Sequence, residues 1–241
     1  MRSRLEPAHQ DAVAATRVVM LPAAYTGPDD FVSAGFVSAA RERSIPLDLV
    51  LLDLQLMHLN DRTLLEQLRR EVILPARAAG CRTVWLCGIS LGGFIALTYA
   101  ERYAGDIEGV CVLAPYLGNR IVTREIALAG GVGGWEPGGL AVDDDERRIW
   151  RFIKKAGKAS QITLTEGARR RPGESLVHLG FGSEDRFAGS HRMMAAALPP
   201  EMVHVVPGGH DWPVWRQLWD NFLDRRLGAL RSSPPVRQPT T

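Results

Sequence analysis

Residues 83–93 read Thr-Val-Trp-Leu-Cys-Gly-Ile-Ser-Leu-Gly-Gly and carry the clearest structural signal in the chain. The apolar first half is typical of a strand buried on both faces of a parallel sheet. A helical pattern follows at residues 91–102, so Ser90 stands at a strand-to-helix turn in the arrangement Gly-x-Ser-x-Gly. We call residues 88–93 the serine turn. It indicates either a nucleophilic serine or, alternatively, a serine that only caps the helix.

Apolar runs of the same kind recur on both sides of the serine turn. Strands are expected at residues 18–21, 47–52, 83–87, 109–113, 176–179 and 203–206, and helices at 31–43, 61–79, 91–102, 193–198 and 212–223. Strands that alternate with helices predict right-handed crossovers and a parallel sheet. We therefore expect an α/β fold, a three-layer sandwich around a mostly parallel sheet of about six strands.

The domain is expected to span residues 17–228, after an N-terminal segment at residues 1–16. The tail at residues 231–241 is rich in Pro and Ser and is expected to be disordered. Within the domain, residues 116–174 separate two expected strands, although a crossover needs only about a dozen residues. This insertion is glycine-rich at residues 130–139. We expect it to form a lid over the carboxyl edge of the sheet, with a surface insertion without function as the alternative.

A nucleophilic serine needs a general base, and the base needs an acid that orients it. His210 follows the last expected strand, and Glu184 and Asp185 follow the strand before it. Parallel sheets place ligands at these carboxyl ends, so the order predicts a triad of Ser90, Asp185 and His210. Asp185 is preferred to Glu184 because its shorter side chain suits a fixed acid. Asp211 is the less favoured acid and is suited to capping the final helix.

Acyl chemistry also requires N–H donors for the oxygen that becomes negatively charged. The backbone N–H of Leu91, directly after the serine, is one expected donor. The second is expected from residues 22–27, the oxyanion loop, where small residues let the backbone approach a carbonyl group. Ala24 is the preferred donor and Tyr25 the alternative. An alanine-rich turn without a role is the competing interpretation.

In the serine turn, the acid position and the histidine position, the sequence resembles the α/β-hydrolases, and more narrowly small bacterial esterase-like members. The segment at residues 207–212, Pro-Gly-Gly-His-Asp-Trp, is similar to the histidine loop of the esterase D and mycolyltransferase group. The resemblance covers about residues 17–228 and implies a minimal six-stranded core. The sequence departs from it twice. It shows no counterpart of the family's first two antiparallel strands, and Pro22-Ala23 stands where the family often has His-Gly.

Composition argues against several other classes of protein. Hydrophobic residues make up 46% and charged residues 23%, as in ordinary soluble proteins, and the net charge of +2 does not favour a nucleic-acid partner. No apolar stretch is long enough for a membrane span, and no signal-peptide core is visible. Cys87 and Cys111 lie in apolar runs typical of buried reduced thiols, so a cytoplasmic protein is expected. No metal or cofactor is expected, since the histidines and cysteines lack ligand spacing.

The sequence thus predicts a serine hydrolase that cleaves an ester or related acyl bond of a small molecule. Ser90 would attack the carbonyl carbon, His210 would move the proton, and Asp185 would hold the imidazole. An acyltransferase with the same triad is one alternative. A hydrolase fold that acts as an inactive binding module is another, and the presence of all three residues argues against it.

Overall fold

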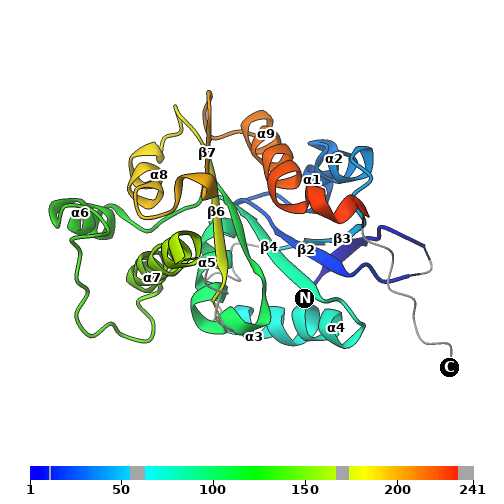
Figure 1. Cartoon of the computed structure of the whole chain (residues 1–241), viewed down its shortest axis with the longest axis horizontal. Helices are drawn as coiled ribbons and strands as arrows, with labels where there is room; N and C mark the ends of the chain where they lie inside the picture. The colour runs from blue at the N-terminus through cyan, green and yellow to red at the C-terminus, as the bar shows by residue number, and fades with distance from the viewer. Residues whose placement is uncertain (11, 55–62, 167–173, 233–241) are drawn as a thin grey trace.

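The computed structural model describes residues 1–10, 12–54, 63–166 and 174–232. The described residues form a seven-stranded sheet with the order β1-β3-β2-β4-β5-β6-β7, and helices cover both of its faces (Figure 1). Every neighbouring pair is parallel except β1 and β3. The strands are β1 (Ser3–Glu6), β2 (Thr16–Leu21), β3 (Leu47–Leu52), β4 (Thr83–Ile89), β5 (Gly109–Leu113), β6 (Leu176–Gly182) and β7 (Val203–Val206).

Helices on the two faces of the sheet bury separate hydrophobic clusters. One cluster involves α3, α4, α5, α6, α7 and α8, and the other involves α1, α2 and α9. This makes the three-layer α/β sandwich that the sequence predicts. The helices are α1 (Pro28–Ser33), α2 (Phe36–Glu42), α3 (Leu64–Leu68), α4 (Leu74–Ala78), α5 (Leu91–Tyr103), α6 (Arg120–Leu128), α7 (Asp145–Glu166), α8 (Ala188–Ala195) and α9 (Trp212–Phe222).

Strand β4 lies in the middle of the sheet and ends directly before Ser90. It pairs with β2 on one side and β5 on the other, and all of its residues after Thr83 are buried. A strand covered by helices on both faces has no solvent side, which explains its unbroken apolar run. The nucleophile candidate therefore directly follows a central strand that is covered on both faces.

The expected number of about six strands is one too few, because the structure adds β1 at the edge of the sheet. β1 runs antiparallel to β3, with Ser3 opposite Leu52 and Glu6 opposite Leu49. Its sequence, Ser-Arg-Leu-Glu, contains a single apolar residue, Leu5, which is exposed. An edge strand with one neighbour needs no apolar run, so hydrophobic patterning does not reveal it. One antiparallel strand is thus present where the sequence shows none.

Three predicted helices have different limits in the structure. The helix expected at residues 193–198 is α8, which begins earlier, at Ala188, and ends at Ala195. The helix expected at residues 31–43 is divided into α1 and α2 at Gly35, whose φ of 81° is left-handed. The helix expected at residues 61–79 begins at Leu64 and contains a π-helical turn between α3 and α4. Residues 61–62 of this prediction, and residues 233–241 of the predicted tail, lie outside the described residues.

Helix α7 accounts for the second half of the long insertion. Its residues Ile149, Trp150 and Ile153 are fully buried, and the helix packs against α5 and β6. α7 therefore occupies the layer position that a right-handed β5-to-β6 crossover requires. Residues 116–144, which include α6, lie between β5 and α7, and the prediction of a lid stays a prediction for this segment. Residues 167–173 of the predicted insertion lie outside the described residues.

Candidate active site

The serine turn holds Ser90 in a strained backbone conformation, with φ 51° and ψ −110°. Such a conformation costs a non-glycine residue on the order of 1–3 kcal/mol and is concentrated at functional sites. The turn is possible because of its glycines. A Cβ atom added at Gly88 would collide with the backbone of Gly92, and one added at Gly92 would collide with the backbone of Leu21. The turn thus projects the serine above the end of β4.

Three loops bring Ser90, His210 and Asp185 into one hydrogen-bonded line. His210 Nε2 lies 3.0 Å from Ser90 Oγ, and His210 Nδ1 lies 2.7 Å from Asp185 Oδ2. The three residues follow β4, β7 and β6, so they meet at the carboxyl edge of the sheet. A neutral ring that donates Nδ1–H to the carboxylate leaves Nε2 free to accept the serine hydroxyl proton.

Asp185 is buried at 5% exposure and keeps its charge through two hydrogen bonds. Burial alone would raise the pKa of Asp185, but hydrogen bonds from His210 and from the backbone N–H of Phe187 outweigh it. The resulting pKa lies below the ordinary value, so the carboxylate is ionised at neutral pH. Glu184, the alternative acid, is exposed, and it is Asp185 that the structure brings to His210.

Aromatic rings enclose His210, which keeps the ring in one orientation. The rings of Phe187 and Trp215 stand nearly perpendicular to it, at centroid distances of 5.4 and 5.1 Å. The neighbouring Asp211 has a separate task, because its carboxylate accepts the N–H of Val214 at 3.1 Å and caps α9. Asp211 thus occupies the cap position for which its sequence context is suited.

The oxyanion loop lies against the serine turn. A Cβ atom added at Gly92 would come within 2.7 Å of the carbonyl oxygen of Pro22, so the two backbones touch next to Leu91. Ala23 and Thr26 close a turn of the loop by a backbone hydrogen bond of 3.3 Å. The structure therefore brings the oxyanion loop beside the amino end of α5, where the sequence predicts a pair of N–H donors.

The two candidate residues for the second donor differ in conformation. Ala24 is half-buried, whereas Tyr25 is 89% exposed and has a φ of 63°. A bulky residue in the left-handed region is uncommon and marks a turn of fixed shape. Ala24 and Tyr25 are the central residues of that turn, so the peptide unit between them is the part of the loop presented outward.

Sequence patterns did not reveal Tyr116, which lies directly beside Ser90. Its backbone N–H donates to the carbonyl oxygen of Ser90 at 2.9 Å, and its ring contacts those of Phe94 and Phe187. Burial, followed by a hydrogen bond to Glu146, raises the pKa of Tyr116 to about 12, so the phenol stays neutral. The sequence could have indicated Tyr116 only by its place in the chain, because Tyr116 follows the carboxyl end of strand β5, as the other candidate site residues follow their strands.

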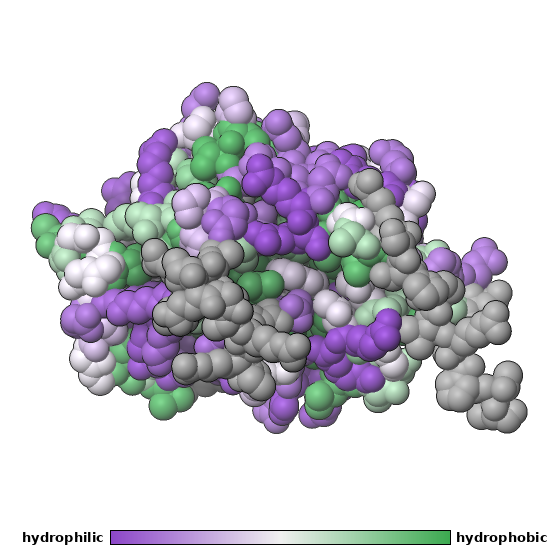
Figure 2. All heavy atoms as spheres, in the orientation of Figure 1, coloured by the Kyte–Doolittle hydropathy of each residue, from purple (hydrophilic) through white to green (hydrophobic). Residues whose placement is uncertain are grey.

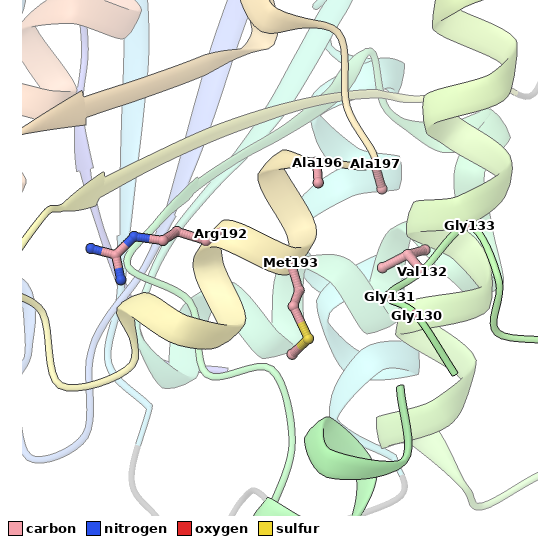
Figure 3. A pocket seen from close by; sticks show the side chains of 8 residues that line it. All are labelled: Gly130, Gly131, Val132, Gly133, Arg192, Met193, Ala196 and Ala197. Atoms are coloured by element: carbon pink, nitrogen blue, oxygen red, sulfur yellow. The ribbon is translucent and has the colours of Figure 1, made fainter. Parts of the chain in front are cut away.

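A separate cavity of about 460 Å³ lies between residues 130–133 and helix α8. Figure 3 shows Arg192 extending away from the glycine-rich segment, and its Nη2 donates to the carbonyl oxygen of Ser183. The rest of the lining is Met193, two alanines and residues 130–133, so it is largely apolar. None of the three aligned residues at the carboxyl edge lines this cavity.

The described residues contain no group of three or more His, Cys, Asp or Glu side chains arranged to hold a metal ion. Among the described helices, none combines the length and the apolar character needed to cross a membrane. On the face in Figure 2, hydrophobic residues occur in small groups among hydrophilic ones. Such a mixed surface is ordinary for a protein face in contact with water.

Solved structures of several hydrolases have the same fold. A ferulic acid esterase matches with a TM-score of 0.58 and 14% identity, over 92% of this chain and 87% of the other. FphF, a fluorophosphonate-binding serine hydrolase of Staphylococcus aureus, matches with a TM-score of 0.59 and 12% identity, over 93% and 88%. The S-formylglutathione hydrolase FrmB of the same organism gives 0.55 and 11%, over 89% and 82%.

At these identities the likeness establishes the fold alone. No curated protein sequence matches the chain. A family model described as alpha/beta hydrolase family matches residues 18–224, which is most of the chain and includes every candidate site residue. With the seven-stranded sheet and the geometry at its carboxyl edge, this match shows that the chain belongs to the alpha/beta hydrolase family.

Proposed function

We propose that the protein is a serine hydrolase that cleaves an ester or related acyl bond of a small molecule. The observation that carries this proposal is the line from Ser90 Oγ through both ring nitrogens of His210 to the buried carboxylate of Asp185, at 3.0 and 2.7 Å. A hydrogen-bonded nucleophile, base and acid is the arrangement that activates a serine at neutral pH. The strained conformation of Ser90 adds support.

In the first half-reaction, Ser90 Oγ forms a bond to the carbonyl carbon while its proton moves to His210 Nε2. The carbonyl oxygen becomes an oxyanion and accepts hydrogen bonds from the N–H of Leu91 and of Ala24, with Tyr25 as the alternative donor. The tetrahedral intermediate then expels the alcohol oxygen, which takes the proton from His210. Asp185 stabilises the imidazolium that exists between these two transfers.

In the second half-reaction, water takes the place of the alcohol. His210 removes a proton from the water molecule, whose oxygen attacks the acyl carbon of the acyl-enzyme. Collapse of the second tetrahedral intermediate returns the proton to Ser90 Oγ and releases the acid. Side chains and backbone N–H groups of this chain, together with water, supply every group in the cycle, so the proposal assigns no metal or cofactor.

The surroundings of the nucleophile support an apolar substrate group. The rings of Phe94, Tyr116 and Phe187 form a contiguous set, and Phe187 also contacts His210. An acyl or alcohol group placed against these rings would remove apolar surface from water, at about 25 cal/mol per Å². We further propose that residues 116–144 cover this side of the site and limit substrate size.

The deciding experiment measures labelling of the purified protein by a fluorophosphonate probe, which reacts only with an activated serine. The wild type and Ser183→Ala should be labelled, and Ser90→Ala should not. Ser183 is a suitable control because it lies two residues from Asp185 but outside the hydrogen-bonded line. A folded wild type that resists the probe and hydrolyses no p-nitrophenyl ester of any chain length would instead be an inactive binding module.

A further inference from the structure

A second buried histidine lies close to the proposed triad without belonging to it. His191, on α8, is completely buried, and its Nε2 is 2.9 Å from the carbonyl oxygen of Pro115. A carbonyl oxygen only accepts, so His191 donates through Nε2–H. Burial lowers the pKa of His191, which keeps the ring neutral with its one proton on Nε2. Nδ1 has no hydrogen-bond partner among the described residues.

The donor of the hydrogen bond between His191 and Pro115 is connected to the turn that carries Asp185. The backbone N–H of His191 donates to the carbonyl oxygen of Phe187 at 3.1 Å, and the N–H of Phe187 donates to Asp185 Oδ1 at 2.7 Å. The imidazole also packs against the ring of Phe181, 5.2 Å away, at the end of β6. His191 is therefore connected to Asp185 through Phe187, whose backbone forms a hydrogen bond with each of them.

The other end of this hydrogen bond, Pro115, packs against the serine turn. A Cβ atom added at Gly93 would lie 2.8 Å from the Cβ of Pro115, so proline and glycine are already in close contact. The next residue, Tyr116, donates its N–H to the carbonyl oxygen of Ser90 at 2.9 Å. Pro115 is thus held against the serine turn independently of His210.

We propose that His191 is a positioning residue that fixes the distance between Asp185 and Ser90. β4 and β6 are not neighbours, since β5 lies between them, and His210 must span the gap with two short hydrogen bonds. The bond from His191 to Pro115 closes a second connection across the same gap. This inference rests on the proposed function, because the distance matters only if the three residues react together.

The structure also supplies a matched control, His178 on β6. His178 is 1% exposed, its ring packs against Phe222, and both of its nitrogens lack a hydrogen-bond partner among the described residues. Replacement of either histidine disturbs a buried site. Only replacement of His191 removes a hydrogen bond between the acid side and the serine side.

The experiment compares His191→Met, His191→Gln and His178→Met by kcat, KM, rate of fluorophosphonate labelling and melting temperature. Methionine keeps the volume without a donor, whereas the glutamine amide places an N–H near the position of Nε2. We expect His191→Met to lower kcat and labelling rate by about 10- to 100-fold with KM changed less than about threefold. His191→Gln should recover most of this loss, and His178→Met should stay within about threefold of the wild type.

Full activity of a folded His191→Met, or equal losses in the Met and Gln variants, would overturn the proposal. His191 would then contribute to packing alone, and its hydrogen bond to Pro115 would have no effect on the reaction. If the Met variant does not fold, ¹⁵N NMR of wild-type imidazoles decides the question, because a proton on Nδ1 of His191 overturns the proposal and a proton on Nε2 supports it. A wild type that neither reacts with the probe nor hydrolyses esters overturns the proposed function itself, and the positioning role with it.

Discussion

The turns that carry Ser90, His210 and Asp185 are held differently from residues 116–144. The turns are shaped by the positive φ of Ser90, by close backbone contacts at the glycines of the serine turn, and by the buried carboxylate of Asp185. Side chains hold the longer segment, and many of them are partly exposed. Its contacts to α7 include Tyr116 and Asn119 with Glu146, Glu125 with Arg147, Glu136 with Lys154, and Leu117 with Trp150.

The difference has an energetic meaning. A hydrogen bond or ion pair at a partly exposed site contributes roughly 0.5–1.5 kcal/mol or less, so the partly exposed contacts of the segment can change without loss of the fold. Ile121 and Leu128 on α6 are exposed, whereas the other face of the segment is buried through Leu117, Val122, Ile126, Val132 and Trp135. Substitutions in the turns should therefore change kcat, and substitutions in the segment should change KM and substrate preference.

The largest expected effect is at Ser90. Ser90→Ala should lower kcat on an activated ester by about 10⁴- to 10⁶-fold, because the attacking oxygen is lost while oxyanion stabilisation and binding remain. The melting temperature should stay at the wild-type value or rise, since alanine leaves the glycine contacts of the turn intact. Retention of full activity would exclude Ser90 as the nucleophile.

The second effect separates two adjacent carboxylates. Asp185→Asn should lower kcat by about 10³- to 10⁴-fold, because the amide can hold the imidazole in the wrong tautomer. Glu184→Gln, the matched control on the same loop, should change kcat less than about tenfold, since its carboxylate is exposed and screened. The measurement is kcat for both variants on one ester, with melting temperatures. The reverse order of effects would move the acid to Glu184.

Acid pH should lower the stability of the fold through a buried histidine of the sheet, His178. Burial, followed by the nearby charge of Arg226, lowers the pKa of His178 to about 3. The unfolded chain takes up this proton below about pH 6.5, so stability is complete above that pH and falls as pH decreases, by up to about 1.4 kcal/mol per unit. His178→Met should reduce this slope in urea unfolding between pH 4 and 7. An unchanged slope would mean that His178 is protonated in the folded protein.

The smallest expected effect concerns the longer segment. Within residues 130–139, Val132 and Trp135 are buried, so a deletion should spare them and remove the exposed Gly138 and Gly139. We expect a several-fold change in KM that depends on ester chain length, with kcat within about threefold of the wild type. Identical KM values across the ester series would leave the segment without a part in substrate binding.

The sequence predicted the parts of the molecule whose signal is local. Ser90, Asp185 and His210 each follow an apolar run within a few residues, and the structure places all three at the carboxyl edge of the sheet. β1 was missed because an exposed edge strand has no apolar period. The role of α7 was missed because loop length alone does not show which helix returns to the sheet.

The contacts around the triad were less accessible to sequence reasoning. The backbone N–H of Tyr116 donates to the carbonyl oxygen of Ser90, and the imidazole of His191 donates to the carbonyl oxygen of Pro115. Every residue has a carbonyl oxygen, so the sequence does not show which ones accept such hydrogen bonds. A buried histidine on a helix resembles any other core residue in the sequence. Only the three-dimensional arrangement distinguishes His191, which has a hydrogen-bond partner, from His178, for which the described residues provide none.

The glycines of the serine turn also shape what a library of single substitutions would reveal. At Gly88 and Gly92 even one methyl group collides with backbone, and at Gly93 it meets the ring of Pro115. Every substitution at these positions should lower the amount of soluble protein, whereas substitutions at Ser90 should leave abundance unchanged. One selection would measure abundance and a second would measure probe labelling for all variants of residues 88–93. Glycine positions that shape the turn would lose both readouts, whereas the proposed nucleophile position would lose labelling alone.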